Sequence, residues 1–269
     1  MPFFHIAILT IIQGITEFLP VSSSGHLVLV PLVTGWQDQG LVMDVAVHVG
    51  TLAAVLVYFA GDLWRMVLGW LGGNWRRRDR QLGRALGFYL VVSAVPVIVA
   101  GGVLYVMGQA VLRDPEVVAW ATIGFGVLLY AFDRIGITVR RVEHMTLGHA
   151  FFIGLAQVLA LIPGASRSGV TMTAARWLGY ERPEAARFAM LMSIPVIGAS
   201  GAVAGFEVWT RGDPIVHASA ALAAALSFVV ALAAIWLLLA LLRRVSFTPF
   251  VIYRLALGGA VLVWLYYLA

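Results

Sequence analysis

The sequence contains no cysteine and no lysine among its 269 residues, and only 12% of its residues are charged. The absence of cysteine excludes disulfides, thiolate metal sites and a cysteine nucleophile. The absence of lysine excludes Schiff-base chemistry and a phosphate-binding lysine loop. Instead, 61% of the residues are hydrophobic, compared with about 45–50% in soluble domains. A chain this short cannot bury so much apolar surface in a water-soluble core, so the sequence predicts an integral membrane protein.

The long apolar stretches predict an all-α polytopic membrane protein that folds as a single membrane domain, residues 1–269. A membrane-spanning helix needs about 20 apolar residues. Six stretches meet or nearly meet this length: Leu41–Ala60, Ala85–Met107, Val117–Phe132, Phe188–Phe206, Ala218–Leu242 and Phe250–Leu268. The net charge of +5 is not gathered with aromatic residues on a soluble module, so we expect no nucleic-acid partner.

The arginines predict the orientation, because cytoplasmic loops carry an excess of positive charge. We assign most of the 18 basic residues to three cytoplasmic loops: Arg65, Arg76, Arg77, Arg78, Arg80, Arg84, Arg134, Arg140, Arg141, Arg243, Arg244 and Arg254. Five more are assigned to the cytoplasmic mouth of a hairpin or to outward loops: Arg176, Arg182, Arg187, Arg113 and Arg211. This assignment leaves Arg167 as the single arginine at membrane depth.

Two further apolar segments, residues 2–34 and 147–178, are each interrupted by a Pro/Gly/Ser cluster, at Pro20–Gly25 and Pro163–Gly169. Neither half of either segment is long enough to cross a membrane comfortably. We therefore predict two re-entrant helical hairpins, the first entering from outside and the second from the cytoplasm. Their irregular backbone requires burial in protein or a water-filled cavity.

The two halves of the chain resemble each other at a shift of about 144 residues, which aligns Ser22 with Ser166 and Gly25 with Gly169. Opposed hairpins, each followed by three spans, predict inverted repeats over approximately 1–132 and 146–269. Folds of this kind place their functional site near the middle, where the broken helices meet.

The first hairpin carries an ionisable residue in an apolar run, which marks a candidate functional site. Gln13 and Glu17 lie four residues apart and share a helix face. Glu17 either caps a neighbouring broken helix or binds a hard cation such as Mg²⁺ or Ca²⁺, which prefer oxygen ligands.

The break that follows contains Ser22, Ser23, Ser24, Gly25 and His26. Serine and glycine at a helix start form an anion site, so Ser22, Ser24 and Gly25 are candidate phosphate-binding residues. A serine beside a histidine is also the minimum for an activated nucleophile with an acid/base partner. The alternative for His26 is a purely structural hydrogen bond.

The second hairpin places a guanidinium and three hydroxyls at a helix start, in the run Ser166, Arg167, Ser168, Gly169 and Thr171. Arginine binds phosphate through two parallel hydrogen bonds, and hydroxyls complete such a site. Arg167 needs an anionic partner at membrane depth, either Glu17 itself or a bound phosphate. Asp44 and His48 are assigned a lower weight, as residues that orient the site or bond between helices.

These two motifs, Gln13–His26 and Pro163–Thr171, resemble the two signatures of the bacterial undecaprenyl-pyrophosphate phosphatase (bacitracin-resistance protein) family. The resemblance covers essentially the whole chain, including Val47–Thr51 and Ser246–Arg254. Membership implies hydrolysis of the C55 isoprenoid pyrophosphate to the monophosphate, a reaction that recycles the lipid carrier of peptidoglycan synthesis and confers bacitracin resistance. It also implies a divalent cation, Mg²⁺ or Ca²⁺, and a bacterial inner-membrane location with the site facing the periplasm.

The resemblance assigns roles residue by residue. Glu17 matches an acidic position and Ser23 the family's proposed nucleophile, while His26 matches the proposed acid/base. The phosphate-binding loop matches Ser166, Arg167, Ser168 and Thr171. Gln13 stands at the family's first acidic position and supplies no charge, so metal binding is assigned to Glu17, with Gln13 as the weaker candidate.

Two rival functions remain to be compared with a phosphoric anhydride hydrolase. The acid-phosphatase-like lipid phosphatases need a lysine and a histidine five residues after their arginine, whereas this chain has no lysine and has Met172 there. The other rival is an inverted-repeat flippase that carries polyprenyl phosphate across the inner membrane. The expected partners are a polyprenyl pyrophosphate substrate, membrane lipids and a second copy of the chain in a homodimer.

Overall fold

The computed structural model describes residues 3–23, 25–26, 30, 34–36, 40–72, 77–107, 114–136, 138–211 and 216–267. Within these ranges the chain is helical, and an isolated bridge between Arg140 and Tyr180 stands in place of any β-strand. The prediction of an all-α protein is therefore confirmed.

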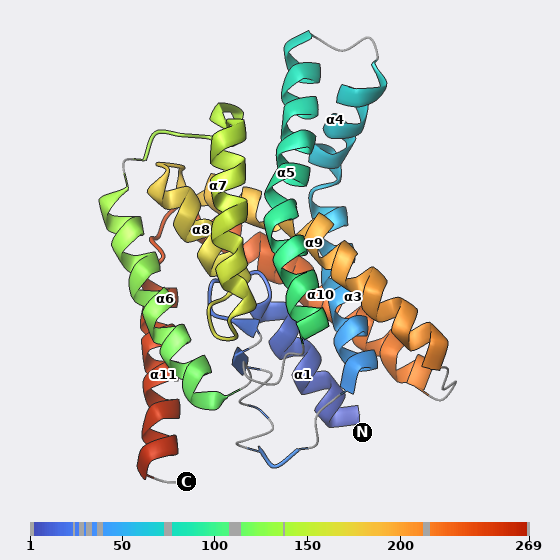
Figure 1. Cartoon of the computed structure of the whole chain (residues 1–269), viewed down its shortest axis with the longest axis vertical. Helices are drawn as coiled ribbons and strands as arrows, with labels where there is room; N and C mark the ends of the chain where they lie inside the picture. The colour runs from blue at the N-terminus through green and yellow to red at the C-terminus, as the bar shows by residue number, and fades with distance from the viewer. Residues whose placement is uncertain are drawn as a thin grey trace.

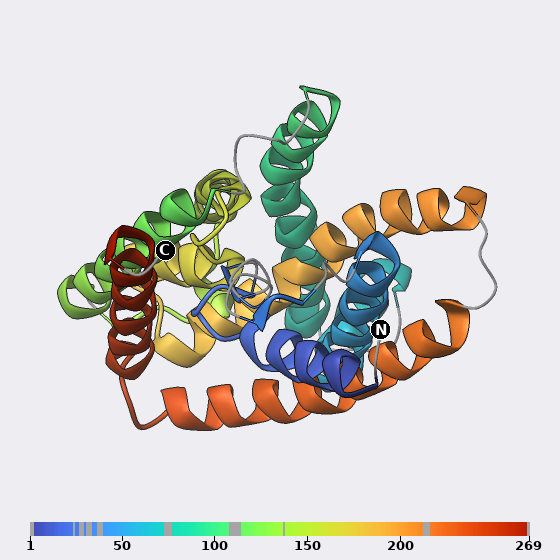
Figure 2. The same cartoon turned by 90° about the horizontal axis from the view of Figure 1, so that it is seen from below.

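The helices are packed as a bundle of upright and strongly tilted elements (Figures 1 and 2). The α-helices are α1 (Phe3–Thr16), α3 (Gly40–Tyr58), α4 (Ala60–Leu71), α5 (Arg77–Met107), α6 (Pro115–Ile135), α7 (Leu147–Gln157), α8 (Arg167–Trp177), α9 (Arg182–Arg211), α10 (Val216–Leu242) and α11 (Thr248–Tyr267). Two short 3₁₀-helices, η2 (Val142–His144) and η3 (Val158–Leu161), flank α7.

Five of the described helices, α5, α6, α9, α10 and α11, are long and apolar enough to cross a membrane. The first predicted span, Leu41–Ala60, differs from the rest, because α3 qualifies as a span only when it is taken together with α4, from which it is bent by 71°. Counting the bent pair as one span gives the six that the sequence predicts. Trp64 and Trp70 are exposed on α4, as expected for a helix at a membrane interface.

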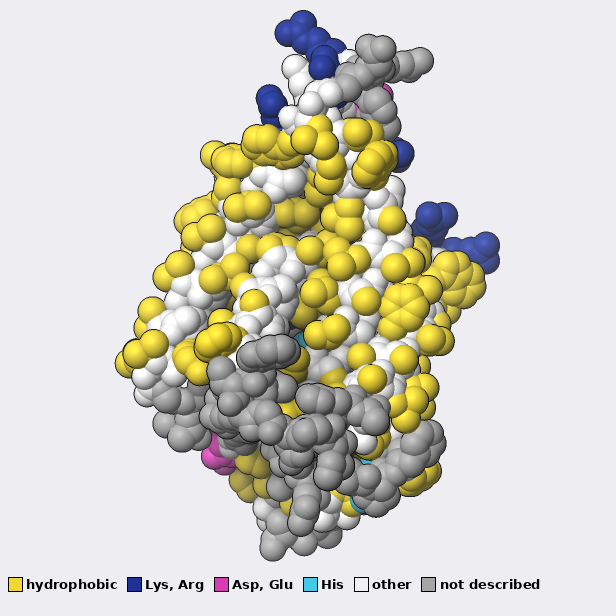
Figure 3. Space-filling view, turned by 90° about the vertical axis from the view of Figure 1, so that its right-hand side faces the viewer, with side chains coloured by type: hydrophobic (Ala, Val, Ile, Leu, Met, Phe, Trp, Pro, Cys, Tyr) yellow, Lys and Arg dark blue, Asp and Glu magenta, His cyan; other side chains and the backbone are white. Residues whose placement is uncertain are grey.

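A band of hydrophobic side chains covers the middle of the molecule, and arginines gather at one end (Figure 3). Exposed residues of α5 such as Val91, Val99 and Val103 contribute to this apolar surface. So large an exposed apolar surface is typical of contact with lipid. We call the end that carries Arg77, Arg80 and the beginning of α5 the arginine-rich end.

Both predicted hairpins close on themselves. In the second, α7 and α8 pack together, and His149 Nδ1 lies 2.8 Å from the Tyr180 hydroxyl at the hairpin's open end. In the first, His5 at the start of α1 stacks on Trp36, with 3.7 Å between ring centroids. The open end of the second hairpin lies toward the arginine-rich end and that of the first lies toward the opposite end (Figure 1).

The turns of the two hairpins are built alike. Ser22 and Ser166 are the non-glycine residues with positive φ in the described chain, at 74° and 71°. Each side-chain oxygen accepts a hydrogen bond from a backbone N–H three residues later, at Gly25 over 3.2 Å and at Gly169 over 3.1 Å. This likeness supports the inverted repeat, whose boundaries stay a prediction.

The main core lies around these turns. Phe18, Met172 and Phe188 are fully or almost fully buried and bring the first hairpin, α8 and α9 into one apolar cluster. This close packing holds the two turns in fixed positions, as the chemistry of a site requires.

Candidate functional site

An ion pair joins the two hairpins at their turns. Arg167 Nη2, at the start of α8, donates to Glu17 Oε1 over 2.9 Å, although the two residues are 150 positions apart. The side chains are only 14% and 6% exposed. A buried charge requires a partner, and the pairing of Glu17 with Arg167 is one of the two arrangements that the sequence predicts.

The other carboxylate oxygen of Glu17 receives two more donors. Ser23 Oγ and Gln13 Nε2 each donate to Glu17 Oε2 over 2.9 Å. Glu17 is therefore in direct contact with the serine expected to act as nucleophile, and it can accept the proton of that hydroxyl.

His26 lies in the same turn but has other partners. Its Nδ1 lies 2.6 Å from the carbonyl oxygen of Ser22, and its Nε2 lies 2.6 Å from the hydroxyl of Tyr253 on α11. The rings of His26 and Tyr253 are almost parallel. In this structure Ser23 bonds to Glu17 and His26 bonds to Tyr253, so the expected Ser–His contact is replaced by two separate pairs. Tyr253 is a site residue that sequence reasoning missed.

The hydroxyls of the second turn hold the backbone of the two hairpins. Ser168 Oγ donates to the carbonyl oxygen of Leu19 over 2.9 Å and lies 3.2 Å from Ser166 Oγ. Thr171 Oγ1 donates to the Arg167 carbonyl over 2.8 Å. A phosphate bound here would have to share these groups with their present partners. Ser24, also expected to bind phosphate, lies outside the described residues.

A second arginine, Arg254, is completely buried against both turns. Its guanidinium donates to the carbonyl oxygens of Pro20 (3.3 Å), Gly164 (2.9 Å) and Ala165 (3.1 Å), and its Nε donates to Thr122 O over 2.9 Å. The expectation that Arg254 belongs to a cytoplasmic loop is wrong. Arg254 faces the site because α11 begins at Thr248, so that Arg254 is already inside the bundle.

Gly169 is required by this arrangement. A Cβ built at Gly169 would lie 2.8 Å from Arg254 Nη1 and 3.1 Å from Ser166 Cβ. Arg254 therefore approaches the start of α8 as closely as a glycine permits.

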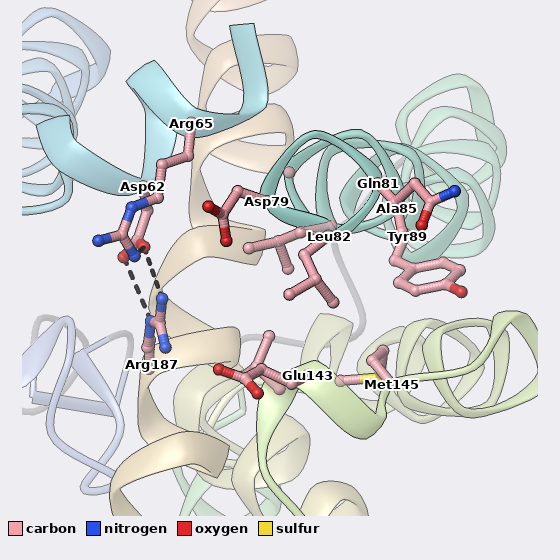
Figure 4. A pocket seen from close by; sticks show the side chains of 13 residues that line it. Asp62, Arg65, Asp79, Gln81, Leu82, Ala85, Tyr89, Glu143, Met145 and Arg187 are labelled. Carbon is pink, nitrogen blue, oxygen red and sulfur yellow. Dashed lines mark hydrogen bonds and ion pairs between the residues drawn. The ribbon is translucent and has the colours of Figure 1, made fainter. Parts of the chain in front are cut away.

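A cavity of about 540 Å³ lies elsewhere, between α4, α5, η2 and α9 (Figure 4). Its charged lining residues include Asp62, Asp79, Glu143 and Arg187, and Arg187 donates to both oxygens of Asp62. Its lining includes none of the residues expected in the site, so the candidate site is the junction of the two turns.

The residues at the junction include oxygen donors for a hard cation. Across the described part of the chain, no three His, Asp or Glu side chains are grouped closely enough to hold a metal ion by themselves. Gln13 is nevertheless fully buried, and its Oε1 has no hydrogen-bond partner among the described residues. Since Mg²⁺ often binds through one or two protein oxygens together with substrate phosphates, Glu17 and Gln13 fit such an ion.

The fold and the site define a class: a polytopic membrane protein in which an acid, an arginine and a serine meet where two broken helical hairpins join. The chain belongs to the family described as bacitracin resistance protein BacA, which matches residues 6–260.

Full-length relatives bear this out. The chain is 51% identical over 267 residues to a protein named undecaprenyl-diphosphatase from Roseobacter denitrificans, covering 99% of this chain and 100% of the relative. It is 50% identical over 262 residues to one from Ruegeria pomeroyi, covering 96% and 97%. A third, from Hahella chejuensis, is 47% identical over 270 residues and covers 99% of each chain. All three relatives carry the same name, undecaprenyl-diphosphatase.

Proposed function

We infer that the protein is an enzyme that hydrolyses undecaprenyl pyrophosphate to undecaprenyl phosphate and inorganic phosphate. The family and the shared name of its full-length relatives support this activity. The reaction recycles the lipid carrier for peptidoglycan synthesis and thereby confers bacitracin resistance.

The observation that carries this proposal is the junction of Glu17, Arg167 and Ser23. A pyrophosphate between the hairpin turns takes the guanidinium of Arg167, which suits two phosphate oxygens at once. Ser166, Ser168, Gly169 and Thr171 lie at the start of α8, where a helix attracts anions, and their hydroxyls would turn from their present partners to the phosphate. Ser22 and Gly25 form the matching turn of the first hairpin.

The nucleophile proposed is Ser23. Its hydroxyl already donates to Glu17 Oε2, so the proton passes to this carboxylate as Oγ bonds to the terminal phosphorus. The bond from that phosphorus to the bridging oxygen breaks, and undecaprenyl phosphate leaves. The phosphate leaving group departs as an anion. His26, whose Nδ1 donates to the Ser22 carbonyl and whose Nε2 lies against the Tyr253 hydroxyl, is placed to take a proton at Nε2 from the water that releases inorganic phosphate, while Glu17 returns its proton to Ser23 Oγ.

A divalent cation, Mg²⁺ or Ca²⁺, held by Glu17 and the amide oxygen of Gln13 would neutralise the pyrophosphate and polarise its P–O bonds. The protein's own contribution is to fix the phosphate with prepositioned donors, which is usually the largest catalytic effect.

The proposed setting is the bacterial inner membrane, with the site open to the periplasm. The chain is a multi-pass membrane protein, and its arginine-rich end belongs on the cytoplasmic side. The first hairpin opens at the other end, from which water and phosphate reach the turns. We also propose a homodimer, since closed pairs are the commonest assembly.

The test is phosphate release by the purified protein from C55 or C15 pyrophosphate in detergent with added Mg²⁺ or Ca²⁺. We expect Arg167→Ala to reduce release by at least about 100-fold, as loss of a transition-state donor does. Arg141→Ala is the matched control, because Arg141 also pairs with a carboxylate, Glu181 over 3.1 Å, but on the surface. Equal release by the two variants would refute the site.

The flippase alternative is not favoured, since the relatives are named for a phosphatase activity. Lipid translocation in vesicles without any phosphate release would reverse that choice.

A further inference from the structure

His48 is a polar residue of α3 whose ring faces the site. Its Nδ1 lies 2.7 Å from the backbone oxygen of Asp44. A carbonyl oxygen only accepts, so Nδ1 carries the proton and the lone pair of the neutral ring is on Nε2. Histidines that bind metals are commonly held in this way, with the second ring nitrogen donating to a backbone carbonyl.

The lone pair of His48 points toward Gln13 and Glu17. His48 Nε2 lies 3.3 Å from Gln13 Nε2 and 3.9 Å from Glu17 Oε2, while Gln13 Nε2 lies 2.9 Å from the same carboxylate oxygen. The Gln13 amide nitrogen thus lies between two acceptors, Glu17 Oε2 and His48 Nε2. A cation in the same place would interact favourably with both. The other end of that amide is Oε1, for which the described part of the chain provides no hydrogen-bond partner.

The ligand atoms considered for one metal ion are His48 Nε2, Glu17 Oε2 and Gln13 Oε1. Bonds of about 2.1 Å place neighbouring ligand atoms about 3.0–3.4 Å apart. Small side-chain rotations bring Nε2 of His48 and Oε2 of Glu17 from 3.9 Å into that range. Rotating the Gln13 amide about its last torsion directs Oε1 to the same point.

We propose that His48 is a nitrogen ligand of the divalent cation at this site, and that the site therefore prefers a transition-metal ion such as Mn²⁺ to Mg²⁺ or Ca²⁺. The proposal rests on the proposed function and deepens it. Imidazole nitrogen favours transition metals, whereas Mg²⁺ and Ca²⁺ favour sites made of oxygen alone. In this chain the imidazole at position 48 adds a nitrogen to a ligand set that otherwise consists of the Glu17 carboxylate and the Gln13 amide oxygen.

Phosphate is needed for tight binding. Arg167 is in contact with Glu17, and its charge repels a cation until an anion neutralises it. The binding experiment therefore uses Mn²⁺ together with methylenediphosphonate, a pyrophosphate analogue that is not hydrolysed.

The experiment records the electron spin echo of Mn²⁺ bound to the purified full-length protein, in which a directly bound nitrogen produces a characteristic modulation. We expect nitrogen modulation in the wild type, its loss in His48→Gln, and its retention in His26→Gln and His149→Gln. His149 is the matched control, because its ring is also held by a hydrogen bond, but to Tyr180 outside the site. The same titrations should give an Mn²⁺ affinity that falls about 100-fold in His48→Gln, at the upper end of the 10–100-fold that outer-shell losses produce.

Absence of nitrogen modulation in the wild type would overturn the proposal, and so would modulation that persists in His48→Gln or disappears in His26→Gln. If His48→Gln does not fold, the wild-type protein provides a second measurement. Fe²⁺ bound in place of Mn²⁺, with ascorbate and peroxide, oxidises a coordinating histidine to 2-oxohistidine. Mass spectrometry should find this product at His48 and not at His149, and an unmodified His48 would refute the assignment.

Failure of this proposal can be distinguished from failure of the proposed function. Failure of the phosphatase proposal appears as absence of phosphate release with any metal, whereas failure of the His48 assignment leaves release intact and removes only the nitrogen signal.

Discussion

Arg254 offers the sharpest test of how the two hairpin turns are held together. We consider Arg254→Met, which keeps an unbranched side chain of similar length but removes every donor. Two of its four acceptors would keep another donor: Thr122 O belongs to a helix, and Gly164 O also accepts from the Thr122 hydroxyl over 3.4 Å. Pro20 O and Ala165 O, one in each turn, lose the donor that links them.

The size of the effect follows from these two carbonyls. A buried acceptor left without a donor costs about 1–3 kcal/mol, so two give about 2–6 kcal/mol. Removing a buried charge offsets part of this loss, which leaves an expected fall of about 2–4 kcal/mol in the free energy of unfolding. The turns also lose their common support, and a displacement of about 1 Å lowers kcat by about 100-fold.

The assay is phosphate release per folded molecule, with folded protein measured by gel filtration and thermal unfolding. Arg176→Met is the matched control, because Arg176 is a buried arginine at the other end of α8 that pairs with Asp133 over 3.0 Å. We expect both variants to lose stability but only Arg254→Met to lose kcat. If Arg254→Met retained wild-type kcat, or if both variants lost activity only in proportion to unfolding, Arg254 would have no positioning role.

Other predictions concern the site and its turns. Glu17→Gln should lower kcat by at least about 100-fold, since it removes the partner of Ser23 and Arg167; near-normal turnover would contradict this role. Tyr253→Phe should lower kcat by about 10-fold, which is part of the 10²–10⁴-fold that general acid–base catalysis supplies. Unchanged kinetics would show that Tyr253 does not support the catalytic role of His26. The free energy of unfolding of Ser166→Gly should exceed that of Ser166→Ala by about 1–2 kcal/mol, because glycine adopts positive φ without strain. Denaturant titration of the two variants in detergent measures this difference, and equal values would contradict it. Chelation of divalent cations should abolish phosphate release, and added Mn²⁺ should restore it; full activity in the chelator would exclude a metal.

The architecture was largely predictable because apolar length and the proline–glycine breaks are local signals. A long apolar stretch indicated each span, and an apolar stretch interrupted by proline, glycine and serine indicated each hairpin. Helix ends were less predictable. The helices α5 and α9 begin at Arg77 and Arg182, because arginine is a good helix former and a helix continues beyond the membrane into water.

The pairing of Glu17 with Arg167 was predictable as one of two arrangements, since each is an isolated charge in an apolar hairpin. The sequence reasoning placed Arg254 in a cytoplasmic loop because Arg243 and Arg244 lie about ten positions before it. A signal was present: Arg254 lies inside the apolar stretch Phe250–Leu268. The contact of His26 with Tyr253 had no local signal, because it depends on which face of α11 packs toward a turn 227 positions away.

The ion pair across the turns has a consequence for the proposed binding of phosphate by Arg167. A phosphate on that guanidinium would compete with the Glu17 carboxylate, which lies 2.9 Å from it. A pyrophosphate, with its higher charge, would displace Glu17 more readily than a monophosphate. Return of Glu17 to Arg167 would then favour release of the product, so that one ion pair would govern both selectivity for the substrate and release of the product.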